Sequence, residues 1–237
     1  MFTPKTLSFL RSLKPNNRRE WFHARRDQYQ QHSRQPMIEV VERLADDMRS
    51  FAPEMLADPK VSLLRPFRDT RFSEDKTPLK THVGATIPHR KLGRMNGAGL
   101  YFEVAPGWVW IGGGLWRPDT SQLQLVRERV ADRHQELAKI VTSPGVKKLG
   151  GLQGDRMTRV PRGFAKDHPA ADFLQSRQFM IFREEPAAFA HSPRFYQQLR
   201  ATFETIMPLL TFLNEPLVEA ERPARRAHLL ADELDGD

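Results

Sequence analysis

The first fifty residues carry apolar side chains at helical spacing. Leucines recur at every third position over residues 4–13, directly after a threonine and a proline that are typical of a helix start. Trp21, Arg25 and Tyr29 share one face of a second predicted helix, and a third helix is expected to begin near Pro36. The amino-terminal part of the chain is therefore predicted to be helical.

The pattern then changes to the period of two that is typical of β-strands. Apolar and polar positions alternate over residues 79–87, and Lys80 and His82 share the polar face of this predicted strand. Residues 100–104 and 108–111 are rich in aromatic and β-branched side chains and flank an Ala-Pro-Gly turn. These two segments predict an antiparallel hairpin.

Helices and one further strand are expected after the hairpin. Residues 119–141 have apolar side chains at helical intervals, residues 179–181 predict a short strand, and residues 195–210 carry the stripe of a late helix. Helices thus precede and follow a run of strands instead of alternating with each strand. This order predicts an α+β fold, with a mostly antiparallel sheet flanked by helices at both ends.

Composition agrees with one folded domain. A chain of 237 residues without a repeat, 39% hydrophobic and 28% charged, can bury one sizeable core. We expect a single domain over residues 1–218 and a frayed or disordered acidic tail over residues 219–237. There is no cysteine, so disulfides, thiolate metal sites and cysteine nucleophiles are excluded. No signal peptide or membrane-length apolar stretch is seen, so we expect a cytoplasmic protein without a membrane partner.

The net charge favours anionic partners. It is +8 for the whole chain, and because the segment from residue 201 onward is acidic, the remainder is more basic than the total suggests. No nucleic-acid recognition motif accompanies this charge. A small anionic ligand is therefore the leading expectation for a partner, and nucleic acid is a less favoured alternative.

The densest polar segment, residues 65–80, comes just before the alternating strand. Arginine forks suit phosphate or carboxylate oxygens, lysines supply point charges, and an aspartate can orient an arginine. The alternative is an ion-pair network, neutralised by the segment's own acids, that holds a loop on the sheet. We leave both interpretations open and expect the following ligand-binding residues: Arg68, Asp69, Arg71, Lys76 and Lys80.

A second cluster, residues 159–169, places cations, a carboxylate and an imidazole beside prolines and a glycine. Arg162 is a further candidate ligand-binding residue, and His168 is a candidate catalytic acid or base because histidine titrates near neutral pH. In the favoured alternative, Asp167 or His168 only caps a helix that begins at Pro169.

Other constellations are weaker. The three glycines at 112–114 are suited either to offering backbone amides to an anion or, as we prefer, to close packing. His82, His89 and His168 lack a recognised ligand spacing, so no metal site is expected, and no dinucleotide or phosphate-loop fingerprint implies a cofactor.

Several short motifs together resemble one known family. They are Asn16-Asn17 with Arg19, Trp21 and Phe22; Arg68-Asp69, Arg71-Phe72-Ser73, Asp75-Lys76, Pro78 and Lys80; Gly112-Gly113-Gly114; and Pro161-Arg162-Gly163-Phe164 with Asp167-His168-Pro169. Over nearly the whole chain the sequence resembles the family called domain of unknown function 2461. That resemblance implies no activity. The chain departs from the family pattern at Leu79, where an aromatic side chain is expected.

Three functional hypotheses remain. The first is a binder of, or enzyme on, a small anionic ligand held by the first cluster, with Arg162 or His168 approaching from the second. The second is a nucleic-acid-associated protein. The third is a structural or interaction module whose basic clusters form internal ion pairs. Whether the chain is an enzyme, and its oligomeric state, are left open.

Overall fold

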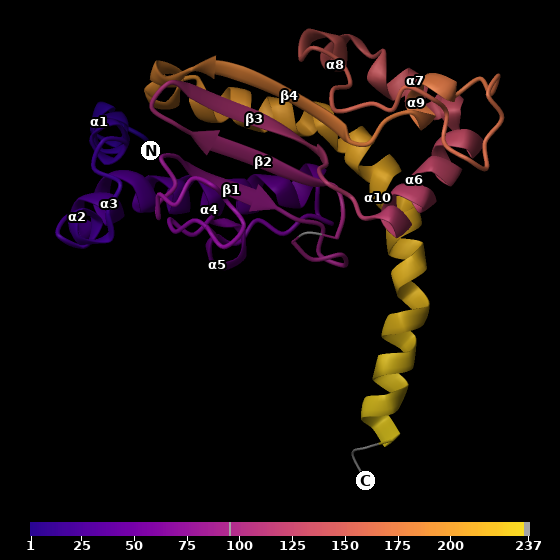
Figure 1. Ribbon diagram of the computed structural model, residues 1–237, viewed down its shortest axis with the longest axis horizontal. Coiled ribbons are helices and arrows are strands. Elements are labelled where there is room, and N and C mark those ends of the chain that lie inside the picture. Colours follow the sequence, from indigo (N-terminus) through magenta and orange to yellow (C-terminus); the bar gives the residue numbers. More distant parts are fainter. Residues whose placement is uncertain (95, 235–237) are drawn as a thin grey trace. The chain divides into compact units, whose positions relative to one another are not determined.

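The computed structural model describes residues 1–94 and 96–234, and in the last helix it describes side chains up to residue 221 (Figure 1). The chain divides into two compact units, and each is described by itself. Unit 1 comprises Met1–Ile87, Leu100–Gly112 and Phe182–Glu204, and unit 2 comprises Pro88–Gly99, Gly113–Ile181 and Thr205–Asp237. The expectation of a single domain over residues 1–218 stays a prediction.

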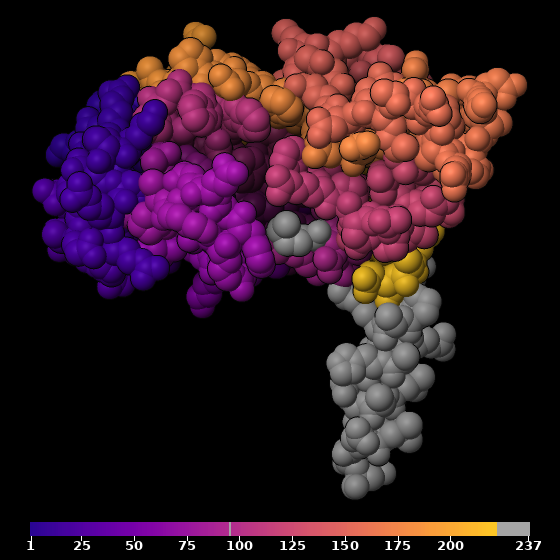
Figure 2. All heavy atoms as spheres, viewed as in Figure 1, coloured from indigo at the N-terminus to yellow at the C-terminus, as the bar shows by residue number. Residues whose placement is uncertain are grey.

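Unit 1 begins with the predicted first helix, α1 (Pro4–Leu13). Proline at the first helical position has no amide hydrogen to leave unpaired, and the Thr3 amide donates to Thr6 Oγ1 at 3.2 Å. The predicted leucine stripe is buried. In Figure 2 the N-terminal helices, coloured indigo, form one continuous piece of the visible surface.

The second predicted helix is interrupted once, and its later part includes a π-helical segment that continues into the next helix. Its parts are α2 (Arg19–His23), α3 (Arg26–Tyr29) and the π-helical segment η1 (Gln30–Arg34). The break falls at Arg25, whose backbone leaves the helical region at φ −123° and ψ 23°. The third helix, α4 (Gln35–Phe51), begins where it was predicted and is followed by the short helix α5 (Pro59–Ser62).

The four strands form one antiparallel sheet in the order β1-β2-β3-β4, which confirms the α+β prediction. The strands are β1 (Val83–Ile87), β2 (Gly99–Val104), β3 (Trp108–Leu115) and β4 (Phe179–Pro186). In the β1–β2 register Gly84 lies opposite Glu103, and Ala85 lies opposite Phe102. Because successive residues point to opposite faces, Phe102 faces the core and Glu103 the other side.

The core of unit 1 lies on one face of this sheet. Phe102 is fully buried and contacts Phe195 and Phe203, with ring centroids 6.4 Å apart in both pairs. These two residues belong to α10 (Phe195–Leu234), which follows the short 3₁₀ helix η2 (Ala187–His191). Helix α4 also packs against β1. The expected tail over residues 219–237 falls on the end of α10 and on residues outside the described part, so it stays a prediction.

Unit 2 contains the helices between β3 and β4. They are α6 (Thr120–Asp132), α7 (His134–Val141), α8 (Pro144–Lys148) and α9 (Ala171–Leu174). The single helix predicted over residues 119–141 is interrupted at Arg133, which adopts φ −121° and ψ 40°. Asp119 caps α6, because its carboxylate accepts the Gln122 amide at 2.8 Å. No helix of the described part is both long and apolar enough to cross a bilayer.

The triple glycine lies inside β3 and not in a loop. Gly114 has φ +140°, and a Cβ atom on it would lie 2.0 Å from the carbonyl oxygen of Phe179. The backbones of β3 and β4 approach each other too closely here for any side chain. The preferred interpretation of this motif, close packing, is therefore correct at Gly114.

Candidate functional site

The basic segment, residues 65–80, folds back on itself in unit 1. Phe67 and Leu79 form an isolated antiparallel bridge. The Arg68 amide donates to the Pro78 carbonyl at 2.9 Å, and the Lys80 amide donates to the Pro66 carbonyl at 2.8 Å. The segment is a closed loop, which we call the basic loop, and β1 begins only after it.

Two arginines of the basic loop meet the loop's own carboxylates. Arg68 donates to Asp75 and, at 2.5 Å, to Thr77 Oγ1, and Arg71 forms a bidentate pair with Asp69 at 3.0 and 2.8 Å. The Arg71 guanidinium is the main cause that lowers the pKa of Asp69 to about 2. The pairs support the alternative in which the loop is an internal ion-pair network.

The remaining predicted residues of the loop differ in exposure. Asp75, which was not among the predicted ligand-binding residues, has its pKa lowered to about 2, chiefly because it accepts a hydrogen bond from the Thr77 amide and then because of Arg68. Lys76 is exposed and donates to the Thr70 carbonyl at 3.0 Å, whereas Lys80 is half-buried. The five ligand-binding residues predicted for this segment thus lie in one loop, where both arginines pair with acids of the loop.

The Asn16-Asn17 motif holds the basic loop to the N-terminal helices. Asn17 Oδ1 accepts the Leu79 amide and Asn17 Nδ2 donates to the Leu79 carbonyl, both at 2.9 Å. The ring of Phe22 meets Phe67 edge to face at 5.8 Å. Leu79 is 1% exposed, so the side chain at this position packs in the core. It also lies outside a strand, which corrects the predicted start of the strand at residue 79.

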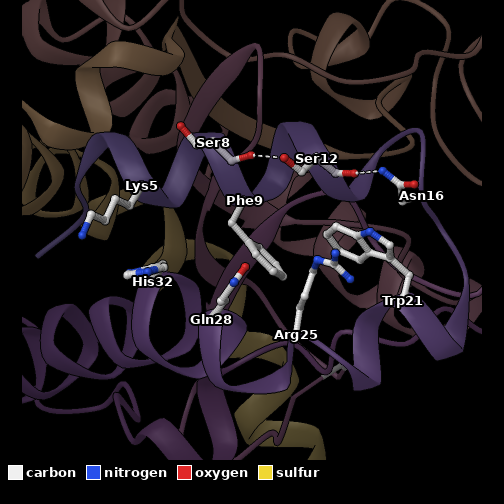
Figure 3. Close-up of a pocket in the computed structure, with 9 residues that line it drawn as sticks. All are labelled: Lys5, Ser8, Phe9, Ser12, Asn16, Trp21, Arg25, Gln28 and His32. Atoms are coloured by element: carbon white, nitrogen blue, oxygen red, sulfur yellow. Dashed lines mark hydrogen bonds between the residues drawn. The ribbon is translucent and has the colours of Figure 1, made fainter.

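A groove of about 510 Å³ lies between α1 and the segment α2–η1 (Figure 3). In Figure 3 Phe9 reaches from α1 into the groove, and Trp21 and Arg25 lie side by side. The Arg25 guanidinium carbon lies 4.5 Å from the Trp21 ring centroid. The groove is lined by Lys5, Ser8, Phe9, Ser12, Asn16, Trp21, Arg25, Gln28 and His32.

The charge of this groove is unbalanced. It contains Lys5, Arg25 and the imidazole of His32, and none of its nine lining residues carries a carboxylate. Neither Lys5 nor Arg25 forms an ion pair with a described residue, unlike Arg68 and Arg71. His32 belongs to η1, and short π-helical segments are frequent at functional sites. The sequence pattern predicted that Trp21 and Arg25 share one helix face, but it did not predict that α1 lies opposite them.

The polar face of the sheet carries a cluster that the sequence did not predict. Glu103 is only 8% exposed, and its carboxylate accepts hydrogen bonds from Tyr101 Oη at 2.5 Å and from Trp108 Nε1 at 2.8 Å. His82 Nε2 lies 3.4 Å from Glu103 Oε2. The one available signal was a carboxylate inside an aromatic strand, where buried acids need partners.

Burial dominates the electrostatics of this cluster. It lowers the pKa of His82, against the opposing effect of Glu103, and Lys80 lowers it further. Burial together with Glu103 raises the pKa of Tyr101, which stays protonated and can donate to the carboxylate. The Glu103 carboxylate therefore accepts hydrogen bonds from two donors, and it lies beside the His82 imidazole, which favours its neutral form.

The second predicted cluster lies in unit 2. Arg162 is exposed, and His168 Nδ1 accepts the Ala170 amide at 3.0 Å just before α9. The predicted helix start at Pro169 is wrong, because α9 begins at Ala171, and no side chain forms a hydrogen-bonded cap on it. The His168 bond belongs to the turn before α9, so the interpretation of His168 as a helix cap is not supported. Since the two clusters belong to different units, their joint action on one ligand stays a prediction.

Metal ligands do not gather within the described residues: no three His, Asp or Glu side chains there are placed to hold a metal ion.

Comparison with known proteins adds a family. Residues 5–212 match the family described as "Conserved hypothetical protein (DUF2461)", the one the motifs resemble. No curated protein and no solved structure shows a significant match.

Proposed function

Because the chain belongs to the DUF2461 family of conserved hypothetical proteins, whose description names no activity, we propose a function from geometry: the chain binds a small anionic ligand. The ligand carries a phosphate or carboxylate group and occupies the groove between α1 and the segment α2–η1. The ligand class is the one expected from the sequence, but none of the residues proposed to hold it belongs to the predicted ligand-binding set.

The observation that carries this proposal is that the nine residues lining the groove include two cations and a histidine but no acid. Lys5 and Arg25 supply ammonium and guanidinium donors, and His32 adds a ring nitrogen. Charge-assisted hydrogen bonds to such donors are stronger than neutral ones. Ser8 and Ser12 of α1 also line the groove, and the Ser12 hydroxyl donates to the Ser8 carbonyl at 3.0 Å.

The Trp21 ring and the Arg25 guanidinium support the same ligand class. A guanidinium over an indole face is held in place by the ring, and less rotational freedom is lost when it binds an anion. Arg25 is therefore the side chain proposed to contribute most to affinity.

Calorimetric titration with inorganic phosphate, at constant ionic strength, tests the proposal. Arg25→Gln is expected to raise the Kd at least about tenfold, because one charge-assisted hydrogen bond contributes roughly 1.5–3 kcal/mol. Arg11→Gln is the matched control, because Arg11 is an exposed cation of α1 outside the groove. The control should leave the Kd within about twofold.

A second candidate concerns the basic loop, whose arginine pairs favour a structural role over ligand binding. Arg71→Gln separates the two. If Arg71→Gln weakens phosphate binding and Arg25→Gln does not, the ligand binds at the basic loop as first predicted, and the groove proposal is wrong. A wild-type chain that binds neither phosphate nor acetate would refute both binding sites.

A further inference from the structure

Unit 2 buries a cation that has no counter-ion among the residues that the structure describes. Arg127, on α6, is 8% exposed. Its Nε donates to the Leu174 carbonyl at 3.0 Å, and its Nη2 donates to the Ser176 carbonyl at 3.1 Å and lies 3.1 Å from Met157 Sδ. All of these acceptors are neutral. No carboxylate of the described residues forms an ion pair with this guanidinium.

A buried guanidinium of this kind is unfavourable unless an anion joins it. Arginine is almost never fully buried without a partner, because removing its charge from water is costly. Burial lowers the pKa of Arg127, and the neighbouring Arg177 lowers it further. The positive charge is thus both desolvated and placed near a second positive charge.

One nitrogen of Arg127 remains for a ligand. Nη1 takes part in none of the bonds given above, and it is not one of the described buried nitrogens that lack a partner. It is therefore reachable from solvent. Arg127 lines a cavity of about 470 Å³, which gives Nη1 a place from which an anion can approach.

Two more arginines line the same cavity. Arg117 and Arg177 lie on its wall together with the acids Asp119 and Asp155. Asp119 is occupied at the start of α6, where its Oδ1 accepts the Ser121 hydroxyl at 2.6 Å and the Gln122 amide. Neither acid forms an ion pair with these arginines within the described chain. Three cations against two acids leave the cavity positive.

The backbone at the edge of the cavity adds a supporting observation. Arg117 has φ +52°, a left-handed conformation that residues other than glycine rarely adopt. Such conformations concentrate at ligand sites, where the surrounding structure holds them. Here the conformation belongs to one of the three arginines.

We propose that this cavity of unit 2 is a second ligand site, which binds the oxyanion of a phosphate or carboxylate group. Arg127 Nη1 binds one oxygen from the floor of the cavity, and Arg177 and Arg117 bind the others from its wall. The site is separate from the groove of unit 1, and neither depends on the other.

The test follows the Arg127 side chain directly. In the Arg25→Gln background, which weakens the groove, inorganic phosphate and acetate are titrated separately while the Nε–H resonance of Arg127 is recorded by NMR. Phosphate, acetate or both should shift this resonance in a saturable way, and the more effective anion identifies the group. Arg177→Gln and Arg117→Gln should each raise the Kd about tenfold.

Two controls keep a structural role apart from a binding role. Lys139→Gln removes an exposed charge of unit 2 outside the cavity and should leave the Kd unchanged. Arg127→Lys keeps the charge but loses the bonds to two carbonyls. If it lowers the Tm while Arg177→Gln and Arg117→Gln leave the Kd unchanged, Arg127 is only a structural clamp and the proposal is wrong. A resonance that neither anion moves in a saturable way also overturns it.

Discussion

At the residue scale, the Asn17 side chain pairs with the backbone amide and carbonyl of Leu79, as a neighbouring strand would in a sheet. The side-chain amide offers one acceptor and one donor to the backbone of a single residue, both at 2.9 Å. The basic loop is thereby attached to the N-terminal helices through one side chain. Sixty-two positions separate the partners in the sequence, so no local pattern indicated the contact.

Asn17→Ala is predicted to destabilise the chain by about 2 kcal/mol, because it leaves a part-buried amide and carbonyl of Leu79 without partners. Chemical denaturation measures the loss. Asn16→Ala is the matched control, since Asn16 makes one exposed bond to the Ser12 carbonyl. Equal losses in the two variants would show that Asn17 does not hold the loop.

His82 is predicted to make stability depend on pH. Burial lowers its pKa below the usual value of 6.5, so the unfolded chain takes up the proton first as the pH falls. The free energy of unfolding should therefore decrease below about pH 6.5, until the lowered pKa is passed.

The His82→Gln variant should lose less stability than the wild type over that pH range, as measured by urea denaturation at several pH values. His191→Gln, at an exposed position, is the control and should follow the wild type. If acidification instead stabilises the wild type relative to His82→Gln, the effect of Glu103 on the His82 pKa outweighs that of burial, and the prediction is wrong.

The sequence identified the acids of the basic loop but could not assign their roles. Asp69 lies two positions before Arg71 in the sequence, and Asp75 lies seven positions after Arg68. Whether residues at such spacings form ion pairs depends on how the loop folds. Both pairs formed, which supports the alternative that was left open. Glu103 was missed for a related reason: its partners Tyr101 and Trp108 meet it only in the sheet.

At the element scale, β3 and β4 pack closely because of one glycine. The Cβ that Gly114 lacks would lie 2.0 Å from a backbone oxygen of Phe179, and a backbone atom cannot rotate away as a flexible side chain can. The φ of +140° is also unfavourable for any other residue. The strand pair therefore requires glycine at this position.

Gly114→Ala is predicted to cost about 3 kcal/mol or more of stability, because the strands must separate to admit the methyl group. Thermal denaturation followed by circular dichroism measures the effect. At Gly107, in the hairpin turn, an added Cβ meets nothing within 4 Å, so Gly107→Ala should change stability much less. If the Gly114→Ala variant unfolds at the same temperature as the Gly107→Ala variant, the claim that β3 and β4 approach too closely for a side chain at residue 114 is wrong.

Most helices and strands were predictable because their apolar periodicity is long and regular. Helix α1, the start of α4 and the hairpin of β2 and β3 were confirmed. The breaks were not predictable, because Arg25 and Arg133 each leave the helical region without a proline or glycine to indicate it. The start of β1 was placed too early, because the alternation of apolar and polar residues begins before the strand does. The backbone of Leu79 bonds to the Asn17 side chain and that of Lys80 bonds to Pro66, so neither residue belongs to the sheet.

At the scale of the whole molecule, the candidate sites depend on contacts between segments that the sequence does not pair. The groove needs α1 beside α2–η1, so Lys5 and His32 face one space although they lie on different helices. The Arg127 cavity needs α6 beside the segments that contain Met157 and Arg177. Composition predicted a preference for anions, but only tertiary structure separates cations paired with acids from cations that are not.

The most direct test of the central claim is a residue-resolved phosphate titration followed by ¹H–¹⁵N NMR, with chloride replaced to keep the ionic strength constant. We predict that in unit 1 the saturable shifts concentrate on the amides around Lys5, Trp21, Arg25 and His32, and that Arg25→Gln reduces them. Shifts confined to the basic loop, or none that saturate in unit 1, would contradict the account.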